Sequence, residues 1–225
     1  MLQEQQKYWD TYLDYIKEQL EVIVIDDCSP NKPAKDYINP DVEYDLSLYR
    51  IQENVRWNWL ACRNLGAYKT KNKWLLLTDM DHAVDSRVIK NLWRNVKHFD
   101  DECIYMFERK DAPNLTQYKP HDDSYFMTRN MFWKVGGYDE DLSGFYGTSG
   151  NYRRRAGAKA KRLVRLKGVY LIRYPREVIA DASTSEFTRK DPVQKEKLKK
   201  IIESKKQARK PIKTLSFPYE EICLR

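Results

Sequence analysis

Two aspartates, Asp79 and Asp81, stand one residue apart after the apolar run WLLL, a pattern typical of a buried strand. In open α/β sheets, ligands bind at the carboxyl ends of the strands, so acids there face a crevice. Side chains alternate along an extended segment, and we therefore expect both carboxylates to point to one side. Hard divalent cations such as Mg²⁺ or Mn²⁺ prefer oxygen ligands and leave positions for water and substrate phosphates. The spacing predicts a metal–nucleotide site.

A simpler interpretation of these acids stays open. The pattern D-x-D occurs by chance in many acidic loops. Asp85, four residues after Asp81, is a good N-cap for a following helix, which shows that acids in this segment can serve local structure alone.

The segments around the aspartates alternate between strand and helix patterns. Apolar spacing predicts helices over residues 4–19 and 58–70 and after Asp85, and a basic helix from Asp191 to about Lys206. The expected strands are EVIVIDD, KWLLLTD, CIYMFER, SYFMT and GVYLIRY. The alternation predicts an α/β fold with a mostly parallel sheet flanked by helices, followed by a basic helical C-terminal appendix.

Composition restricts the class of protein. With 225 residues and 41% hydrophobic content, the chain is expected to form one globular domain. The longest apolar runs are far shorter than the roughly 20 residues that cross a bilayer. The N-terminus shows no signal-peptide pattern, which predicts a cytoplasmic location. The four cysteines lack C-x-x-C spacing and are expected to be reduced, and the histidines show no zinc-ligand spacing.

Charge is distributed unevenly along the chain. Residues 150–225 contain 22 lysines and arginines against 8 acids, whereas residues 1–149 contain 19 against 25. The basic part is either a solvated surface or a site for an anionic partner such as nucleic acid or a polyanionic acceptor.

Four motifs occur in an order that resembles the family 2 glycosyltransferases and their GT-A fold. They are VIVIDDCS, ACRNLG, LLLTDMD and the segment VGGYDED, within residues 21–147. The resemblance implies a nucleotide-sugar donor, with a UDP-sugar expected, and a bound Mn²⁺ or Mg²⁺. We divide the chain into a catalytic domain, 1–180, and a basic helix and tail, 181–225. The domain has a nucleotide-sugar part, 1–110, and an acceptor-side part, 111–180.

The resemblance also implies roles for individual residues. Asp27 would contact the nucleotide base, and Arg63 would lie by the base or the diphosphate. Asp79 would contact the ribose or the metal, and Asp81 would bind the metal that bridges the diphosphate. Asp139, with Gly136, Gly137 and Tyr138, would border the acceptor pocket, and we take Asp79, Asp81 and Asp139 as the catalytic set.

Three features depart from the family pattern. The usual first strand, which lies beside the VIVIDD strand, is missing from this sequence. Ser149 and Gly150 stand where an acid pair with the general base is expected, so Asp139, Asp141 or Asp123 would have to substitute, or the reaction retains configuration. No histidine follows His121 to act as a late metal ligand, and Asp181 is the candidate replacement.

Three functions follow from these observations. The first is a metal-dependent glycosyltransferase that moves a hexose to an acceptor hydroxyl. The second is a degenerate GT-A domain that binds a nucleotide or a polyanion without turnover. The third, a nucleic-acid-binding protein built on the basic tail, is not favoured because it lacks the glycine–aromatic signatures of RNA-binding modules.

Overall fold

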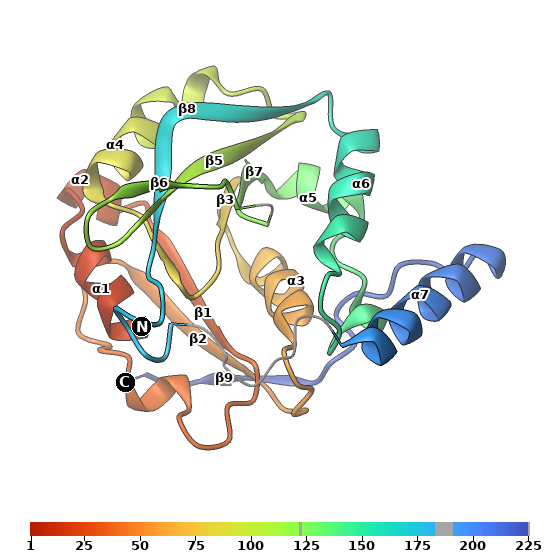
Figure 1. The fold of residues 1–225 in the computed structure, drawn as a ribbon. Coiled ribbons are helices and arrows are strands. Elements are labelled where there is room, and N and C mark those ends of the chain that lie inside the picture. Colours follow the sequence, from red (N-terminus) through yellow and green to blue (C-terminus); the bar gives the residue numbers. More distant parts are fainter. Residues whose placement is uncertain (122, 183–190, 225) are drawn as a thin grey trace.

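The computed structural model describes residues 1–121, 123–182 and 191–224, and its strands form two sheets flanked by helices (Figure 1). The α-helices are α1 Leu2–Asp10, α2 Asp14–Lys17, α3 Trp59–Lys69, α4 Ser86–Asn95, α5 Arg129–Val135, α6 Ser149–Lys159 and α7 Pro192–Gln207. The strands are β1 Glu21–Asp26, β2 Asp45–Ile51, β3 Trp74–Leu77, β4 His82–Ala83, β5 Cys103–Asp111, β6 Thr116–Tyr118, β7 Tyr125–Thr128, β8 Arg162–Arg173 and β9 Tyr219–Ile222. One sheet has the order β1-β2-β9, and the other has the order β3-β7-β5-β8-β4 with β6 beside β5.

Most of the expected elements are confirmed. Asp85 caps α4 by accepting the N–H of Val88, and Asp191 caps α7 by accepting the N–H of Val193. The helix expected over residues 4–19 is instead two helices, because Leu13 adopts an extended conformation between α1 and α2. This break places Tyr12 in the interior, where its hydroxyl donates to the carbonyl of Val84 at 2.8 Å.

The prediction of a mostly parallel sheet is wrong, because the strand pairing is mixed. The pairs β1–β2 and β5–β8 are parallel, whereas β2–β9, β3–β7, β4–β8, β5–β6 and β5–β7 are antiparallel. Short connections allow β6 and β7 to return along β5, and antiparallel pairs need only such short loops. The sequence analysis also missed β2, β4, β6, α6 and β9.

Among the described residues the two sheets share no strand, which agrees with the expectation that no first strand lies beside VIVIDD. Among the described residues, β1 pairs only with β2 and β3 pairs only with β7, so each strand has an edge without a strand partner. Helix α3 packs on both sheets. Leu60 contributes to the cluster that contains Leu75 and Leu77, and Leu65 contributes to the cluster that contains Ile25. The helix, rather than a shared strand, joins the two sheets.

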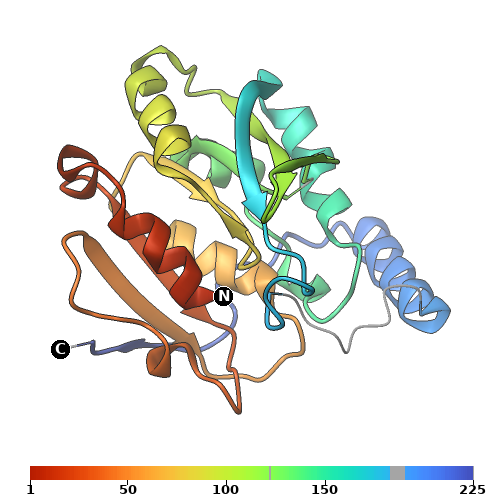
Figure 2. The same cartoon turned by 60° about the vertical axis from the view of Figure 1, so that its left-hand side comes forward.

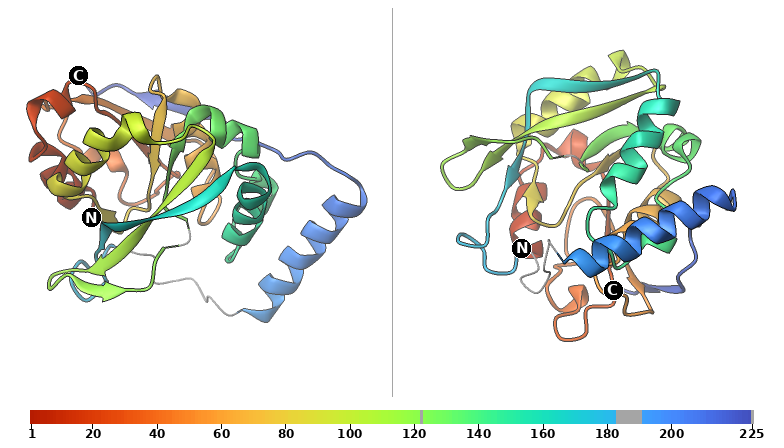
Figure 3. Two further views of the ribbon diagram at one scale, coloured as in Figure 1. Left: turned by 90° about the horizontal axis from the view of Figure 1, so that it is seen from above. Right: turned by 45° about the vertical axis from the view of Figure 1, so that its right-hand side comes forward.

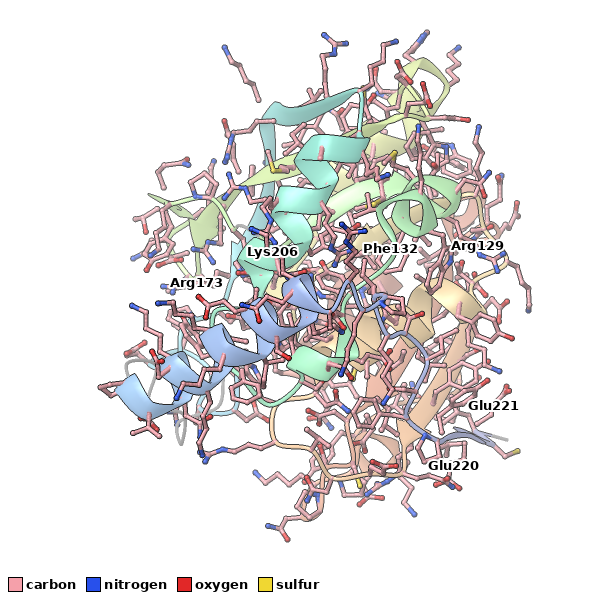
Figure 4. The ribbon with its side chains drawn as sticks, turned by 90° about the vertical axis from the view of Figure 1, so that its right-hand side faces the viewer. Arg129, Phe132, Arg173, Lys206, Glu220 and Glu221 are labelled. Atoms are coloured by element: carbon pink, nitrogen blue, oxygen red, sulfur yellow. The ribbon has the colours of Figure 1, made fainter. Side chains whose placement is uncertain are left out.

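The C-terminal segment returns to the body of the protein after α7, which projects from it (Figure 3). Figure 4 looks onto this segment, with Lys206 in the last turn of α7 and Glu220 and Glu221 on β9. Leu198 of α7 is buried in the largest cluster, and β9 extends the first sheet by pairing with β2. Of the predicted tail 181–225, residues 183–190 and 225 lie outside the described part of the chain.

Candidate functional site

The segment that contains Asp79 and Asp81 is a turn between β3 and β4. The N–H of His82 donates to the carbonyl of Asp79 at 3.1 Å. The side-chain amide of Gln5 on α1, the helix at the front of Figure 2, donates to the carbonyls of Met80 and His82 at 2.7 and 2.9 Å. The expectation of an extended segment with parallel carboxylates is therefore wrong, and the turn gives the two aspartates different neighbours.

Asp79 lies between a cation and an imidazole. Its Oδ1 accepts a hydrogen bond from Nη2 of Arg63, and its Oδ2 lies 3.2 Å from Nε2 of His121. Burial alone would raise the pKa of Asp79, but Arg63, followed by His121 and His82, outweighs burial and lowers this pKa below its ordinary value. Asp79 is therefore ionised at neutral pH, and its side chain is 37% exposed.

Arg63 is held by aromatic and polar groups. The residue is only 7% exposed, and its guanidinium lies 4.8 Å from the ring centroid of Trp59. Its Nη1 donates to the hydroxyl of Tyr138 at 2.9 Å and to the carbonyl of Asp123. Burial opposes the charge, but the effects of Tyr138, Asp79 and Asp123 together raise the pKa of Arg63. The structure thus brings Arg63 and Asp79 together, as expected for two residues of one site.

His121 adds a neutral imidazole to the site. Burial, with smaller contributions from His82, Arg63 and Arg109, lowers the pKa of His121 to about 4, although Asp79 acts in the opposite direction. At pH 7 the ring is therefore uncharged, and the neutral imidazole is the form that binds metal ions.

Asp79, His82 and His121 form a group that fits a divalent cation. One ligand atom from each residue lies within 4.8 Å of the others. The Nδ1 of His82 is buried and faces Oδ1 of Asp81 at 2.6 Å. One carboxylate and two imidazoles form a mixed oxygen–nitrogen donor set of the kind that binds divalent transition-metal cations.

Asp26 and Asp27, the acidic pair at the end of β1, have different environments and different roles. Asp26 is 5% exposed and accepts the N–H groups of Ser29 and Ala34 at 2.6 and 2.9 Å, so it closes the turn after β1. Asp27 is half-buried, and burial and the neighbouring Asp26 raise its pKa, partly offset by a hydrogen bond from the backbone of Asn58. The turn-forming role therefore belongs to Asp26, which leaves contact with the base as the prediction for Asp27.

Asp139 lies in a different, closed environment. It is 6% exposed, and its Oδ1 lies 2.6 Å from Nζ of Lys205 and accepts the N–H of Lys213 at 3.3 Å. Asp141 also pairs with Lys205 at 2.6 Å. Gly136 has the left-handed conformation of a helix C-cap, with φ of 95°. The catalytic role of Asp139 stays a prediction, and the contacts found there hold the C-terminal segment.

Asp181 does not join the group around Asp79. Its carboxylate pairs with the amino group of Met1 at 2.9 Å and is 57% exposed. The two histidines of the group were missed as ligands because their spacing from each other and from the cysteines matches no zinc motif. His82 could have been found from its position directly after D-x-D, whereas nothing in the sequence connects His121 with it.

The fold and the site together define a class of protein. The protein is a mixed α/β domain with a carboxylate–imidazole group beside the end of β3 and an acidic pair at the end of β1, an arrangement that agrees with the GT-A fold expected from the sequence. The family model for Glycosyl transferase family 2 matches residues 4–160, more than half of the chain. The chain belongs to glycosyl transferase family 2.

Two solved structures of S. aureus TarS show the same fold. The crystal structure of S. aureus TarS 1–349 has a TM-score of 0.56 and 16% identity, covering 79% of this chain and 60% of that chain. A second S. aureus TarS structure gives the same score and identity but covers 36% of that chain. A structure of GalNAc-T7 with UDP, GalNAc and Mn²⁺ has a TM-score of 0.49 and 13% identity, covering 69% of this chain and 38% of that one. This chain thus spans less than two thirds of each.

Two further findings concern curated relatives and membrane spans. No curated protein matches the chain in sequence. None of the described helices combines the length and the apolar character needed to span a bilayer.

Proposed function

We propose that this protein is a metal-dependent glycosyltransferase that moves a hexose from a UDP-sugar to an acceptor hydroxyl, and that it acts in the cytoplasm. The observation that carries the proposal is the meeting of Asp79, His82 and His121 within 4.8 Å in a chain of family 2. Asp79 belongs to the motif that predicted the site, His82 directly follows that motif, and His121 lies in the loop after β6.

The residues of the site have distinct tasks in this proposal. Asp79, His82 and His121 would hold the cation, with Asp81 beside the Nδ1 of His82. A divalent cation, when bound, neutralises the negative charge that develops on the departing nucleotide diphosphate. Arg63 keeps Asp79 ionised and oriented by their hydrogen bond. Asp27 accepts a hydrogen bond from the imide N–H of the base.

A second candidate is a GT-A domain that binds a nucleotide without turnover. It is favoured by the position where an acid pair was expected, because Ser149 and Gly150 begin α6 there and bring no carboxylate. Asp139, a possible substitute base, is engaged with Lys205. A hydroxyl such as that of Ser149 is not an unassisted base near neutral pH.

The experiment that distinguishes these candidates measures UDP binding and the release of UDP from UDP-hexoses. UDP release from a panel of UDP-hexoses would be followed with Mn²⁺, with Mg²⁺ and with a chelator, beside calorimetric titration of UDP. We expect metal-dependent UDP release and metal-dependent UDP binding. Asp81→Asn should weaken the metal-dependent part of the binding, because it removes the negative charge beside the Nδ1 of His82, one of the residues that would hold the cation.

Asp41→Asn is the matched control, because Asp41 is an exposed acid outside the site. Metal-dependent binding with no release, for any sugar and with acceptor hydroxyls supplied as free sugars, would favour the second candidate. The absence of both binding and release would contradict both candidates.

A further inference from the structure

Arg109 is a buried cation next to the site that the glycosyl-transfer chemistry does not use. It lies near the end of β5 and is 6% exposed. Its Nη1 lies 3.3 Å from Nε2 of His82, one of the three residues that fit the cation. Arg109 therefore stands in direct contact with the site, on the side of His82 away from Asp81, whose contact is with Nδ1.

The contacts of Arg109 do not neutralise its charge. Its Nε donates to the carbonyl of Lys119 at 2.9 Å, and its guanidinium lies 4.7 Å from the ring centroid of Tyr118. Among the residues that the structure describes, no carboxylate forms an ion pair with Arg109, and the hydrogen bonds of its guanidinium use Nε and Nη1.

Two other arginines near the site each have a carboxylate partner among the described residues, unlike Arg109. Arg173 makes a two-pronged pair with Asp111, with distances of 2.8 and 2.6 Å, and Arg63 bonds to Asp79. Arg173 also lies over the ring of Tyr118, at 4.0 Å from its centroid, so that two cations share one ring. Arg109 of β5 and Arg173 of β8 belong to paired strands of the second sheet, and Figure 4 shows the labelled Arg173 apart from Glu220 and Glu221 of β9.

A buried charge without a counter-ion is unfavourable. Burial is the largest effect on Arg109 and lowers its pKa, and Arg173 lowers it further, while Asp81 and Asp111 offset this only in part. Arginine nevertheless stays protonated in proteins, so it cannot escape the cost by losing its proton. A buried and uncompensated cation is destabilising unless an anion meets it.

We propose that Arg109 is the anchor of a phosphate-binding subsite adjoining the Asp79–His82–His121 group. The planar fork of a guanidinium matches the oxygens of a phosphate and binds it more strongly than a neutral donor would. The proposal rests on the proposed function, because a phosphate reaches this site either in the diphosphate of the donor or in a phosphate-bearing acceptor. It adds to that function a residue, Arg109, that binds the phosphate of the substrate.

The test compares Arg109→Gln with Arg165→Gln, which removes the same charge from an exposed position on β8. Pyrophosphate, inorganic phosphate, UDP and uridine would be titrated by calorimetry into the full chain. We expect Arg109→Gln to weaken pyrophosphate binding by about tenfold or more, the loss of one charge-assisted hydrogen bond. Arg165→Gln should stay within about twofold of the unchanged protein by the same conversion.

Two arms identify the source of the phosphate. Weaker binding of UDP, with uridine unaffected, assigns the subsite to the diphosphate of the donor. Weaker binding of inorganic phosphate to protein already saturated with UDP and Mn²⁺ assigns it to a phosphate-bearing acceptor. Either result supports the subsite.

Stability measurements distinguish a structural role of Arg109 from an anion-binding role. A purely structural Arg109 would make Arg109→Gln less stable without any ligand, whereas an anion-binding Arg109 leaves stability unchanged or raised and loses the stabilisation by pyrophosphate. Arg109→Lys keeps the charge, loses the fork and should bind pyrophosphate with intermediate affinity.

Equal binding of all probes by the unchanged protein and by both variants would overturn the subsite, as would the absence of phosphate and pyrophosphate binding by the unchanged protein. These readouts do not depend on sugar transfer. Failure of UDP-sugar turnover with intact, Arg109-dependent phosphate binding would therefore contradict the proposed function alone.

Discussion

The acids around Asp79 and those around Asp139 have similar residue types but opposite environments. Asp79 is 37% exposed and is flanked by Arg63, His82 and His121, with one neutral imidazole at 3.2 Å. Asp139 has a side chain that is 6% exposed, and it is paired with the ammonium group of Lys205.

The difference lies in what completes each group. The 139–141 cluster, defined as Asp139, Glu140 and Asp141, is completed by the protein itself. Glu140 accepts the N–H groups of Leu215 and Ser216 at 2.8 and 2.7 Å. The Asp79 group keeps a partly exposed carboxylate and lies beside Arg109, a cation that forms no ion pair with a carboxylate of the described residues. Polar groups that the protein satisfies stabilise the fold, and those that it leaves unsatisfied indicate a ligand.

The largest effect, a loss of turnover, is expected from a substitution of Asp79. Asp79→Asn removes a carboxylate from the proposed cation site and leaves Arg63 without its ionic partner. We expect a loss of UDP-sugar turnover of at least about 100-fold, the scale of one transition-state electrostatic contact. Steady-state UDP release measures it, with Asp41→Asn as the control. Turnover within a few-fold of the unchanged protein would show that Asp79 is no more functional than Asp139.

A smaller effect, on stability rather than on metal binding, is expected from Asp139→Asn. The substitution leaves the largely buried Lys205 with Asp141 alone, and it should lower the free energy of unfolding by about 1–3 kcal/mol. Denaturant unfolding measures the change, while calorimetric UDP titration with Mn²⁺ should be unchanged. The double variant Asp139→Asn with Lys205→Met should recover part of the loss. Lost turnover with full stability would instead make Asp139 the substitute base.

The smallest effect is expected from Asp141→Asn. This carboxylate is 37% exposed, so solvent screens its pairs with Lys205 and with Lys213, which lies 3.9 Å away. The free energy of unfolding should fall by less than about 1 kcal/mol. The same denaturant titration measures the change, and a loss as large as that of Asp139→Asn would mean that burial does not distinguish the two acids.

Elements with a local signal were predicted, and those without one were missed. The β-branched run of β1, the apolar run of β3 and the cap residues of α4 and α7 each determine local structure, and the structure confirms them. The strand β9 was missed because its sequence, YEEI, alternates weakly and becomes a strand only by pairing with β2. The break after α1 was missed because it depends on the burial of Tyr12.

The sequence by itself determined the family, the order of the main strands and helices, and the place of the motif around Asp79, because these depend on neighbouring residues and on short periodic patterns. Only the tertiary structure decided which side chains meet there. It brought His121, from the loop between β6 and β7, next to Asp79. It also placed Arg109 in contact with His82 and paired the buried Asp139 with Lys205. The physical reason is that the charge state and the use of a carboxylate depend on its burial and on cations supplied from distant parts of the chain, and local sequence contains neither.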